Sequence, residues 1–535
     1  MSVDSCKILP HAPLPKGGAA EFGNKAWNLM LMTGAGLPVP AAFVLPAPFG
    51  RIVRAGDGDQ ELTAVLSSGI AALETATGLG FGSPRRPLLV SVRSGAAVSM
   101  PGMLETVLNV GMNAATVDGL IAQTGNPRLA WDCYRRLVQG YAEVVQGLTR
   151  GPFDELIAQA LASAGAEKES ELDYITLRDL ARELLNHFEE LAGIPFPEDP
   201  REQLRQAALA VFRSWDAPKA ATYRNAHGID PDGGTSVTVQ RMVYGNAGGD
   251  SGAGVAFTRN PATGAAELYL DFEFNAQGED VVSGRLASHS ASQGDNRLRR
   301  VLPRAWTQLE EAGHTLEALF HDAQDFEFTL QSGALYLLQS RSAKRTAWAA
   351  LQIAVDQVDE GLITPSEALS RLAGINLPAV VRTRIADAGA EPLARAQAAS
   401  LGVASGVIAL DSDAAKRLAC AAKPVILVRP ETETADIEGM MHAAGILTAA
   451  GGRTSHAAVV ARQLGKVCLV ACPDLEIDLK RRACRIGRRT MPEGDWLSLD
   501  GNDGGVYAGR LEVIIERPER ALARIENWRR SADAA

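Results

Sequence analysis

Residues 445–472, GILTAAGGRTSHAAVVARQLGKVCLVAC, constrain the fold more than any other segment of the chain. The apolar start predicts a strand, and Gly451-Gly452 then permits a tight turn. Thr454 and Ser455 are good N-cap residues, and the alanine-rich run that follows them is typical of a helix. A further apolar run predicts a strand over 467–471. This order of strand, turn, helix and strand indicates a β/α unit.

His456 comes directly after the two N-cap residues and therefore lies at the predicted N-terminus of this helix. Unpaired backbone N–H groups and the positive end of the helix dipole would stabilise a phosphoryl group on the imidazole ring there. The same dipole lowers the pKa of a histidine toward the neutral form that nucleophilic attack requires, and Arg462 lies within two turns. The segment therefore predicts a nucleophilic histidine, whereas a histidine taken at random is usually a structural hydrogen-bonding group.

The composition is that of a globular protein with several domains. The 535 residues are 46% hydrophobic and 22% charged, enough for roughly three or four units that each bury a core. With 63 acidic and 53 basic side chains, the net charge is -10, which argues against non-specific binding to nucleic acid or an anionic membrane. The first residues lack a secretion-signal pattern, and no apolar run approaches the roughly 20 residues of a membrane span. We therefore expect a cytoplasmic protein without nucleic-acid or membrane partners.

Six cysteines are scattered along the chain without a paired framework. We expect their thiols to stay reduced. Cys468 and Cys472 are predicted to be buried strand residues, because their spacing and the lack of a second pair do not suit a zinc site.

Apolar periodicity divides the chain into four segments. Residues 1–345 have short strands and glycine-rich turns on both sides of a helical subdomain at about 115–225, a pattern typical of an α+β domain. Residues 346–395 are predicted to form a helical linker region, and residues 396–510 a β/α domain. Residues 511–535 suit one amphipathic helix with a frayed tail. The expected fold class is a multidomain combination of α+β and α/β parts.

Three segments of the first domain have the composition of phosphate-binding loops. In FGNKAWNL, residues 22–29, a glycine turn precedes Lys25, so backbone amides and this cation can face phosphates. Arg93 ends a predicted strand beside a loop of small residues, which suits close approach to a triphosphate. Closely spaced glycines that include Gly252 and Gly254 could line a phosphate nest with their N–H groups. Each feature alone is equally typical of a surface charge, a loop or a hairpin.

Two predicted strands near the end of this domain carry polar side chains in alternation. Asp325 and Glu327 share one face of the first strand, and Gln339 and Arg341 share one face of the second. If the strands are neighbours, the four polar groups lie together. Glu327 and Gln339 then offer oxygen ligands of the kind that Mg²⁺ prefers, and Arg341 can stabilise charge on a transferring phosphoryl group. The alternative is an exposed sheet face with incidental charges.

Both halves of the chain resemble a known family. The run GGRTSHAAVVAR at 451–462 is similar to the phosphohistidine signature of the phosphoenolpyruvate-utilising enzymes. VILVRPET at 425–432 and DIEGM at 436–440 resemble the same domain of the pyruvate phosphate dikinase family. In the first domain the resemblance also includes VFRSW at 211–215, FTRNP at 257–261, NAQGED at 275–280 and KRT at 344–346. It covers the chain from about 17 to 510.

The resemblance implies an ATP-grasp-type nucleotide domain with a helical insertion, followed by a swivelling phosphohistidine domain. It implies ATP as substrate, Mg²⁺ as cofactor and His456 as the phosphorylated residue. The nucleotide and metal positions of the family match Lys25, Arg93, Asp325, Glu327, Gln339 and Arg341. A swivel needs a hinge, and we expect it among the small residues at 396–405.

Some features depart from the family. Its full-length members continue into a barrel that binds phosphoenolpyruvate and pyruvate, so we expect the acceptor of this chain to be a separate chain or a small molecule. Ala97 and Ala253 replace residues that could contact phosphate, which weakens the expectation that inorganic phosphate is a second acceptor. Two alternatives stay open: a phosphotransferase for a non-pyruvate molecule, and a non-catalytic nucleotide-binding regulatory module.

Overall fold

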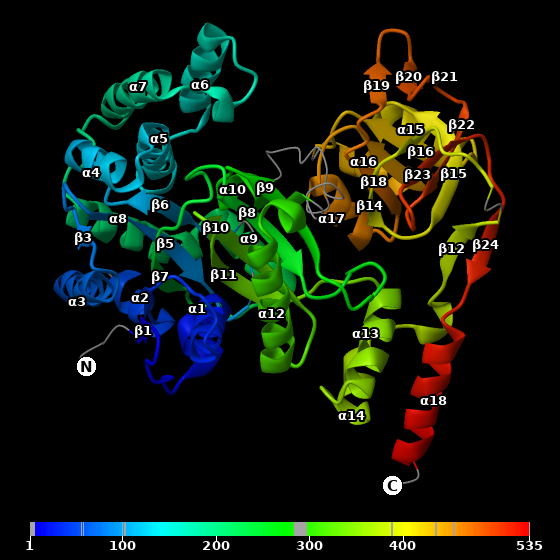
Figure 1. Cartoon of the computed structure of the whole chain (residues 1–535), viewed down its shortest axis with the longest axis horizontal. Helices are drawn as coiled ribbons and strands as arrows, with labels where there is room; N and C mark the ends of the chain where they lie inside the picture. Colours follow the sequence, from blue (N-terminus) through cyan, green and yellow to red (C-terminus); the bar gives the residue numbers. More distant parts are fainter. Residues whose placement is uncertain are drawn as a thin grey trace. The chain divides into compact units, whose positions relative to one another are not determined.

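The computed structural model describes residues 6–533 except 55, 57, 99, 101–102, 283–296, 387–388, 434–435 and 453–454 (Figure 1). The chain forms two compact units. The first comprises Met1–Ser251 and Thr329–Arg341, and the second comprises Gly252–Phe328 and Ser342–Ala535. Residues of the predicted nucleotide domain, 1–345, therefore belong to both units. The fold is the expected combination of α+β and α/β parts.

The first unit is built on an antiparallel sheet of five strands in the order β1-β2-β7-β5-β6. The strands are β1 (Cys6–Ile8), β2 (Ala42–Leu45), β5 (Val90–Gly95), β6 (Thr106–Val110) and β7 (Ser236–Arg241). Apolar side chains of the sheet share one core with helices α2 (Ala47–Arg54), α3 (Asp59–Thr77) and α8 (Pro200–Arg213). The sheet also contacts α1 (Gly18–Gly34), whose beginning carries the predicted Lys25.

The predicted helical segment of the first unit consists of six helices. They are α4 (Ala114–Thr124), α5 (Pro127–Val144), α6 (Gly151–Ala164), α7 (Tyr174–Ala192), α8, and α9 (Pro218–His227). Polar N-caps start four of them, because Asn113, Asn126, Asp173 and Asp199 each accept a hydrogen bond from a backbone N–H of the first turn. The apolar faces of α4 to α8 continue the core of the sheet, whereas α9 packs in a small separate cluster with Trp215.

A buried ion cluster fixes the central helix of this segment. Asp132 on α5 accepts hydrogen bonds from Arg135 at 2.8 Å, from Arg136 at 3.0 Å and from the amide of Asn246 at 3.2 Å. Both Asp132 and Arg135 are fully buried. Burial raises the pKa of the Asp132 carboxyl, but the positive charges of Arg136 and Arg135 outweigh it and hold that pKa well below its usual value.

The second unit contains part of a four-stranded sheet in the order β11-β10-β8-β9. Its strands are β8 (Gly252–Phe257), β9 (Tyr269–Phe274), β10 (Gln324–Gln331) and β11 (Ala334–Ser342), and helix α12 (Pro303–Phe320) precedes β10. The boundary between the two units falls within β10 and again at the end of β11.

The second unit also contains an eight-stranded sheet in the order β13-β23-β22-β15-β16-β17-β18-β14. Its four consecutive parallel strands are β15 (Val403–Ala409), β16 (Val425–Arg429), β17 (Gly445–Thr448) and β18 (Val467–Val470). The flanking strands are β13 (Ala394–Arg395), β14 (Gln397–Ser400), β22 (Trp496–Asp500) and β23 (Gly505–Ala508). The strands predicted at 403–409, 424–428 and 467–471 are all present.

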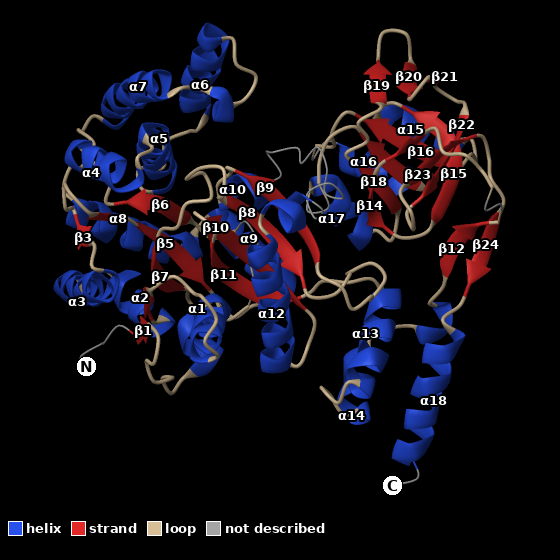
Figure 2. Ribbon diagram, viewed as in Figure 1, coloured by secondary structure: helices blue, strands red, loops and turns tan. Residues whose placement is uncertain are grey.

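Both faces of this sheet are covered. Helices α15 (Ser412–Cys420), α16 (Ile437–His442) and α17 (His456–Gln463) share an apolar cluster with one face (Figure 2). A three-stranded meander of β19 (Leu475–Asp478), β20 (Ala483–Ile486) and β21 (Arg489–Pro492) contributes to the cluster on the other face. Cys468 lies in β18 and Cys472 just beyond it, and burial raises the pKa of their thiols to about 12 and about 11.

A helical base and a two-stranded ribbon connect to this sheet. Helices α13 (Ala347–Asp359), α14 (Pro365–Leu372) and α18 (Glu519–Asp533) share one apolar cluster. Strands β12 (Arg382–Ile385) and β24 (Val513–Glu516) pair with each other in antiparallel register. The predicted terminal helix therefore begins at Glu519, after a strand that sequence reasoning missed. Among the described residues, no helix has the length and apolar character needed to cross a membrane.

The predicted hinge at 396–405 is not a linker. Most of these residues form β14 and the start of β15, and both strands are hydrogen-bonded within the eight-stranded sheet. A run of small residues suits a buried strand as well as a hinge, because both require side chains that occupy little space. β12 and β24, which precede and follow the eight-stranded sheet along the chain, form a two-stranded sheet of their own.

Asp132→Asn tests the buried ion cluster. The neutral amide removes the buried charge that Arg135 and Arg136 share and leaves them only the partly exposed Glu169, so we expect the free energy of unfolding at pH 7 to fall by about 3 kcal/mol. A carboxyl whose pKa is lower in the folded than in the unfolded protein stabilises the fold at pH values above its unfolded-state pKa of about 3.9. This stabilisation is lost as the pH falls from there through the pKa of the folded state. The difference in the free energy of unfolding between the parent and the variant should stay constant between pH 7 and 5 and should shrink below about pH 4.

Urea titrations at several pH values measure this difference. Asp118→Asn, at an exposed position of α4, is the matched control and should change the free energy of unfolding by less than about 0.5 kcal/mol. A difference that grows on acidification would contradict the assignment.

Candidate functional site

The Lys25 loop lies against the end of β5. Helix α1 is interrupted at Gly23, which has φ 75° and ψ 152°. A Cβ atom at Gly23 would lie 2.2 Å from the carbonyl oxygen of Gly95 at the end of β5, so only glycine permits this approach. The backbone N–H of Asn24 donates to Ala96 at 3.1 Å, and the Ser236 hydroxyl lies 2.7 Å from the Gly95 oxygen. The glycine turn that precedes Lys25 is thereby fixed beside Arg93's strand.

Strand β11 joins the same part of the first unit. Arg93 donates to the carbonyl oxygen of Leu338 at 3.4 Å, and the Asn28 amide donates to that of Ser340 at 2.8 Å. These bonds hold β11, which carries Gln339 and Arg341, beside α1 and β5. The structure therefore brings together the segments of four predicted site residues that lie far apart in the sequence: Lys25, Arg93, Gln339 and Arg341.

The alternation on the two polar strands follows the prediction. On β11, Gln339 is half-buried and Arg341 exposed, whereas Ser340 between them is buried on the opposite face. On β10, Asp325 is buried and Glu327 half-buried, on either side of Phe326. The two strands are hydrogen-bonded neighbours in the four-stranded sheet. A joint nucleotide site of these carboxylates with Lys25 and Arg93 stays a prediction.

Glu327 and Gln339 stay the predicted ligands of a magnesium ion. The described residues contain no group of three or more His, Cys, Asp or Glu that could hold a metal by themselves. Mg²⁺ usually takes one or two protein oxygens together with waters and substrate phosphates. One carboxylate and one amide on neighbouring strands provide this kind of incomplete ligand set.

Gly252 and Gly254 have a packing role. Both lie in β8, which runs between β10 and β9. A Cβ atom at Gly252 would lie 2.2 Å from the ring of Phe272, and one at Gly254 would lie 2.6 Å from the ring of Phe328. These rings are stacked, with centroids 5.8 Å apart. The glycines make room for the ring pair, and their contact with phosphate stays a prediction.

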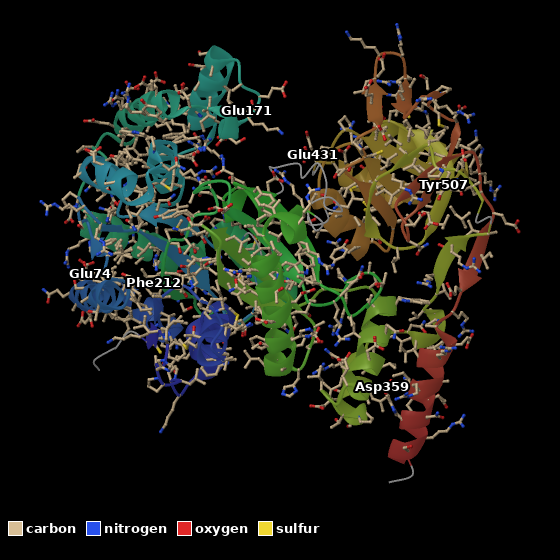
Figure 3. The ribbon with its side chains drawn as sticks, in the orientation of Figure 1. Glu74, Glu171, Phe212, Asp359, Glu431 and Tyr507 are labelled. Carbon is tan, nitrogen blue, oxygen red and sulfur yellow. The ribbon has the colours of Figure 1, made fainter. Side chains whose placement is uncertain are left out.

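His456 is the first residue of α17, as the sequence predicts, and Ser455 is its N-cap. Because β15 to β18 are parallel, their carboxyl ends lie at one edge of the sheet, and the loop between β17 and α17 returns from that edge. The loop after β16, which includes Glu431, returns from the same edge (Glu431 is labelled in Figure 3). Arg453 and Thr454 of the signature lie outside the described residues.

Two hydroxyl groups at this edge are buried without a hydrogen-bond partner among the described residues. They belong to Ser455, 6% exposed, and to Thr432, 5% exposed, in the loop after β16. Buried polar atoms normally find partners, so unpaired ones mark places where a ligand or water can bind. Sequence reasoning treated Ser455 only as a cap and gave Thr432 no role. Their burial without partners could not be read from the sequence.

A charged pair that sequence reasoning missed braces the same edge. Arg429, at the end of β16, forms an ion pair with Asp436 at 3.2 Å and donates to the Leu410 carbonyl after β15. Asp436 also accepts from the hydroxyl of Ser412 at 3.1 Å. The cluster ties together the chain segments that leave β15 and β16.

Arg462 braces the helix itself. It lies in the last turn of α17 and donates to the carbonyl oxygen of Ala399 in β14 at 3.0 Å. Burial lowers the pKa of its guanidinium. The structure thus gives Arg462 the role of holding α17 to the edge of the sheet.

Gly23→Ala tests the close approach that positions Lys25. The new methyl group would collide with the Gly95 carbonyl and would occupy a left-handed conformation, so we expect the free energy of unfolding to fall by about 3 kcal/mol. The displaced loop should weaken ATP binding at least about tenfold, equivalent to 1.4 kcal/mol. Denaturant titration and calorimetry measure the two effects. Gly34→Ala, at the end of the same helix with no atom within 4 Å of its new Cβ, should leave ATP binding unchanged.

Comparison with known proteins identifies two matching families. Residues 53–304 match the family described as pyruvate phosphate dikinase, AMP/ATP-binding domain. Residues 421–504, which include His456, match the family described as PEP-utilising enzyme, mobile domain.

Similar proteins extend along nearly the whole chain. A pyruvate, phosphate dikinase of Clostridium symbiosum is 42% identical over 95% of this chain and 58% of its own length. Those of Rhizobium meliloti and Entamoeba histolytica are 41% and 40% identical over 97% and 93% of this chain, and over 59% and 56% of their own lengths. The chain thus spans less than three fifths of these relatives. By its two domains and these relatives, the chain belongs to the pyruvate phosphate dikinase family.

Proposed function

We propose that this chain is an ATP-dependent phosphotransferase in which His456 receives a phosphoryl group from ATP and passes it to an acceptor. The observation that carries the proposal is the place of His456 at the start of α17, on the carboxyl edge of four parallel strands, within the part of the chain that matches the mobile domain. The match of residues 53–304 to an AMP/ATP-binding domain supports ATP as the donor.

The chemistry follows from the position of the histidine. The lone pair of the unprotonated ring nitrogen forms the N–P bond, and the electron pair of the broken P–O bond leaves with the nucleotide. The amino-terminal end of α17 presents free N–H groups and a positive dipole, which favour both the neutral ring and the anionic product. The hydroxyls of Ser455 and Thr432, which have no partner within the described part of the chain, offer hydrogen-bond donors to the phosphoryl oxygens at the same edge.

The residues predicted for the nucleotide site provide the remaining charge. Lys25 and Arg93 bind the phosphates, and Arg341 stabilises charge on the transferring group. Glu327 and Gln339 would hold Mg²⁺, which neutralises phosphate charge when bound. The names of the relatives indicate pyruvate and phosphate as their substrates, and we propose pyruvate as the final acceptor, reached through a separate chain.

His456→Asn tests the phosphorylation site. With ATP and Mg²⁺, the parent should acquire an acid-labile, base-stable label, because a phosphoramidate hydrolyses in acid, and the variant should acquire none. His442→Asn, an exposed histidine on α16, is the matched control and should label like the parent. Equal labelling of His456→Asn would refute the proposal, and complete absence of label from the parent would refute it as well.

Glu327→Ala and Gln339→Ala test the metal ligands. Each variant should lower the metal-dependent rate of His456 labelling at least about 100-fold, because the removed oxygen no longer positions the charge that the transition state needs. His456→Asn should still bind ATP by calorimetry, because the histidine only receives the group. Glu311→Ala, an exposed carboxylate on α12, should label at the parent rate. Parent-like rates in both ligand variants would show that the metal is held elsewhere.

A further inference from the structure

Gln397 is a buried amide that has no part in the proposed chemistry. It is the first residue of β14 and is only 7% exposed. Within the described part of the chain, neither the oxygen nor the nitrogen of its side chain has a hydrogen-bond partner. A buried polar atom without a partner destabilises a fold, so native proteins rarely keep one unless a water, an ion or a role in the chemistry accounts for it. The side chain of Gln397 has two such atoms.

The register of β14 places Gln397 at the edge of the sheet that carries His456. β14 runs antiparallel to β18, and Gln397 lies opposite Val470, the last residue of β18. The carboxyl end of β18 belongs to the edge from which the loop before α17 returns. Gln397 therefore lies at the same edge of the sheet as the start of α17.

The same register places Gln397 on the face that α17 covers. Residues directly opposite each other in an antiparallel pair have their side chains on one face of the sheet. Val470 packs in a cluster with Ala457 and Ala458 of the first turn of α17, and this helix contacts both β14 and β18. The amide of Gln397 consequently lies under the beginning of the helix that carries His456.

Arg462 leaves this amide unsatisfied. Its guanidinium donates to the backbone carbonyl of Ala399, two residues further along β14, and not to the side chain of Gln397. The hydroxyls of Ser455 and Thr432, at the same edge, also have no partner among the described residues. Three buried polar side chains thus lie at the edge where α17 begins, and all three can still form hydrogen bonds.

A histidine that attacks phosphorus needs a proton on one ring nitrogen and a lone pair on the other. A neutral imidazole exists in two tautomers, and the hydrogen bond of the protonated nitrogen selects between them. An amide oxygen only accepts, so it pairs only with the protonated nitrogen, whereas a hydroxyl can pair with either one. The amide NH2 group only donates, which suits the hydroxyl and phosphoryl oxygens of this edge. Gln397 therefore provides an acceptor that Ser455 and Thr432 do not.

On the basis of the proposed function, we propose that Gln397 is a positioning residue for His456. Its side-chain oxygen accepts a hydrogen bond from the protonated ring nitrogen and thereby keeps the other nitrogen free to attack. When that lone pair becomes the N–P bond and the P–O electrons leave with the nucleotide, the ring gains positive charge. The remaining ring N–H stays on the amide oxygen, whose partial negative charge stabilises the charged ring.

Gln397→Met tests the positioning role. Methionine is unbranched and similar in size, so it keeps the packing of β14 and removes both polar atoms. At saturating ATP, single-turnover labelling of His456 should slow at least about tenfold, because only one tautomer of the ring can attack. The ATP concentration that gives the half-maximal rate should stay unchanged, since the variant leaves Lys25 and Arg93 in place. A labelling rate equal to that of the parent would overturn the positioning role.

Two further variants separate this role from packing. Gln397→Glu keeps an acceptor oxygen at the same reach and should label faster than Gln397→Met. Ser400→Ala is the matched control, because Ser400 is buried on the same face at the other end of β14, opposite Cys468, and it should label at the parent rate. The urea midpoint of Gln397→Met should equal or exceed that of the parent, because the variant removes an unsatisfied buried amide.

Nuclear magnetic resonance of the full chain with ring-¹⁵N-labelled histidine tests the bond without any phosphoryl transfer. At about pH 8, where an ordinary imidazole is neutral, His456 should hold one tautomer in the parent and in Gln397→Glu, and both tautomers in Gln397→Met. His456→Asn assigns the signal. The same balance of tautomers in the parent and in Gln397→Met would overturn the bond. If the parent acquires no label from ATP, the proposed function fails, whereas the tautomers still decide whether Gln397 positions the ring.

Discussion

Four parallel strands that share one edge determine where His456 can lie. In β15 to β18 every carboxyl end reaches the same edge, so each loop that continues the chain must start there. Helix α17 begins in one of these loops with His456, and the Arg429–Asp436 pair braces the neighbouring ones. Both faces of the sheet are buried, under helices on one side and partly under the β19–β21 meander on the other. The edge is the part of the sheet where polar chemistry can be placed.

In the first unit, the corresponding constraint is a backbone contact. Gly23 and Gly95 approach so closely that neither could carry a side chain without displacing a neighbour. This contact, with the bonds of Asn28 and Arg93 to β11, gathers three segments that are separated by up to 312 residues. Long-range contacts of this kind cost loop-closure entropy, and the shared core of the sheet and its helices compensates for it.

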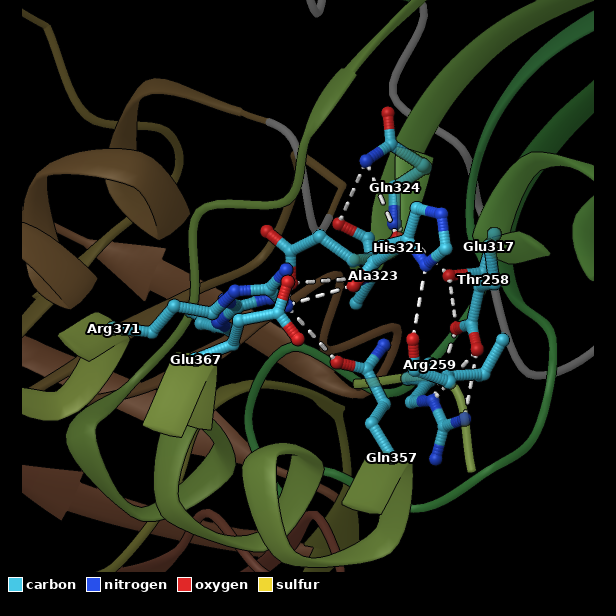
Figure 4. A network of polar contacts seen from close by, with 12 residues as sticks. Thr258, Arg259, Glu317, His321, Ala323, Gln324, Gln357, Glu367 and Arg371 are labelled. Carbon is cyan, nitrogen blue, oxygen red and sulfur yellow. Dashed lines mark hydrogen bonds and ion pairs between the residues drawn. The ribbon is translucent and has the colours of Figure 1, made fainter. Parts of the chain in front are cut away.

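The helical base and the β12–β24 ribbon are held by different contacts. Helices α13 and α14 are held by hydrogen bonds, ion pairs and an apolar cluster (Figure 4). The β12–β24 ribbon has one ladder, and it is joined to the eight-stranded sheet by bonds of Thr383 to Val403 and Asn502 and by packing of Ile385 against Val403 and Tyr507.

The sequence by itself determined the features that depend on neighbours along the chain. The start of α17 at His456 follows from a glycine turn, a capping residue and helix-forming alanines, and the shared faces of Asp325 with Glu327 and of Gln339 with Arg341 follow from strand alternation. The likeness to the family signature indicated which residues are expected to bind ATP and to receive the phosphoryl group, and the matches at 53–304 and 421–504 confirmed the family.

Tertiary structure decided what depends on partners far away. Gly252 and Gly254 suit a phosphate loop by composition, and only the structure shows that they also give room to the rings of Phe272 and Phe328. The small residues at 396–405 suit a hinge equally well, yet strands from 467–470 and 496–500 pair with them. Composition states only how much room a segment needs. Which atoms fill that room is decided by the pairing of strands and the packing of side chains that meet only when the chain folds.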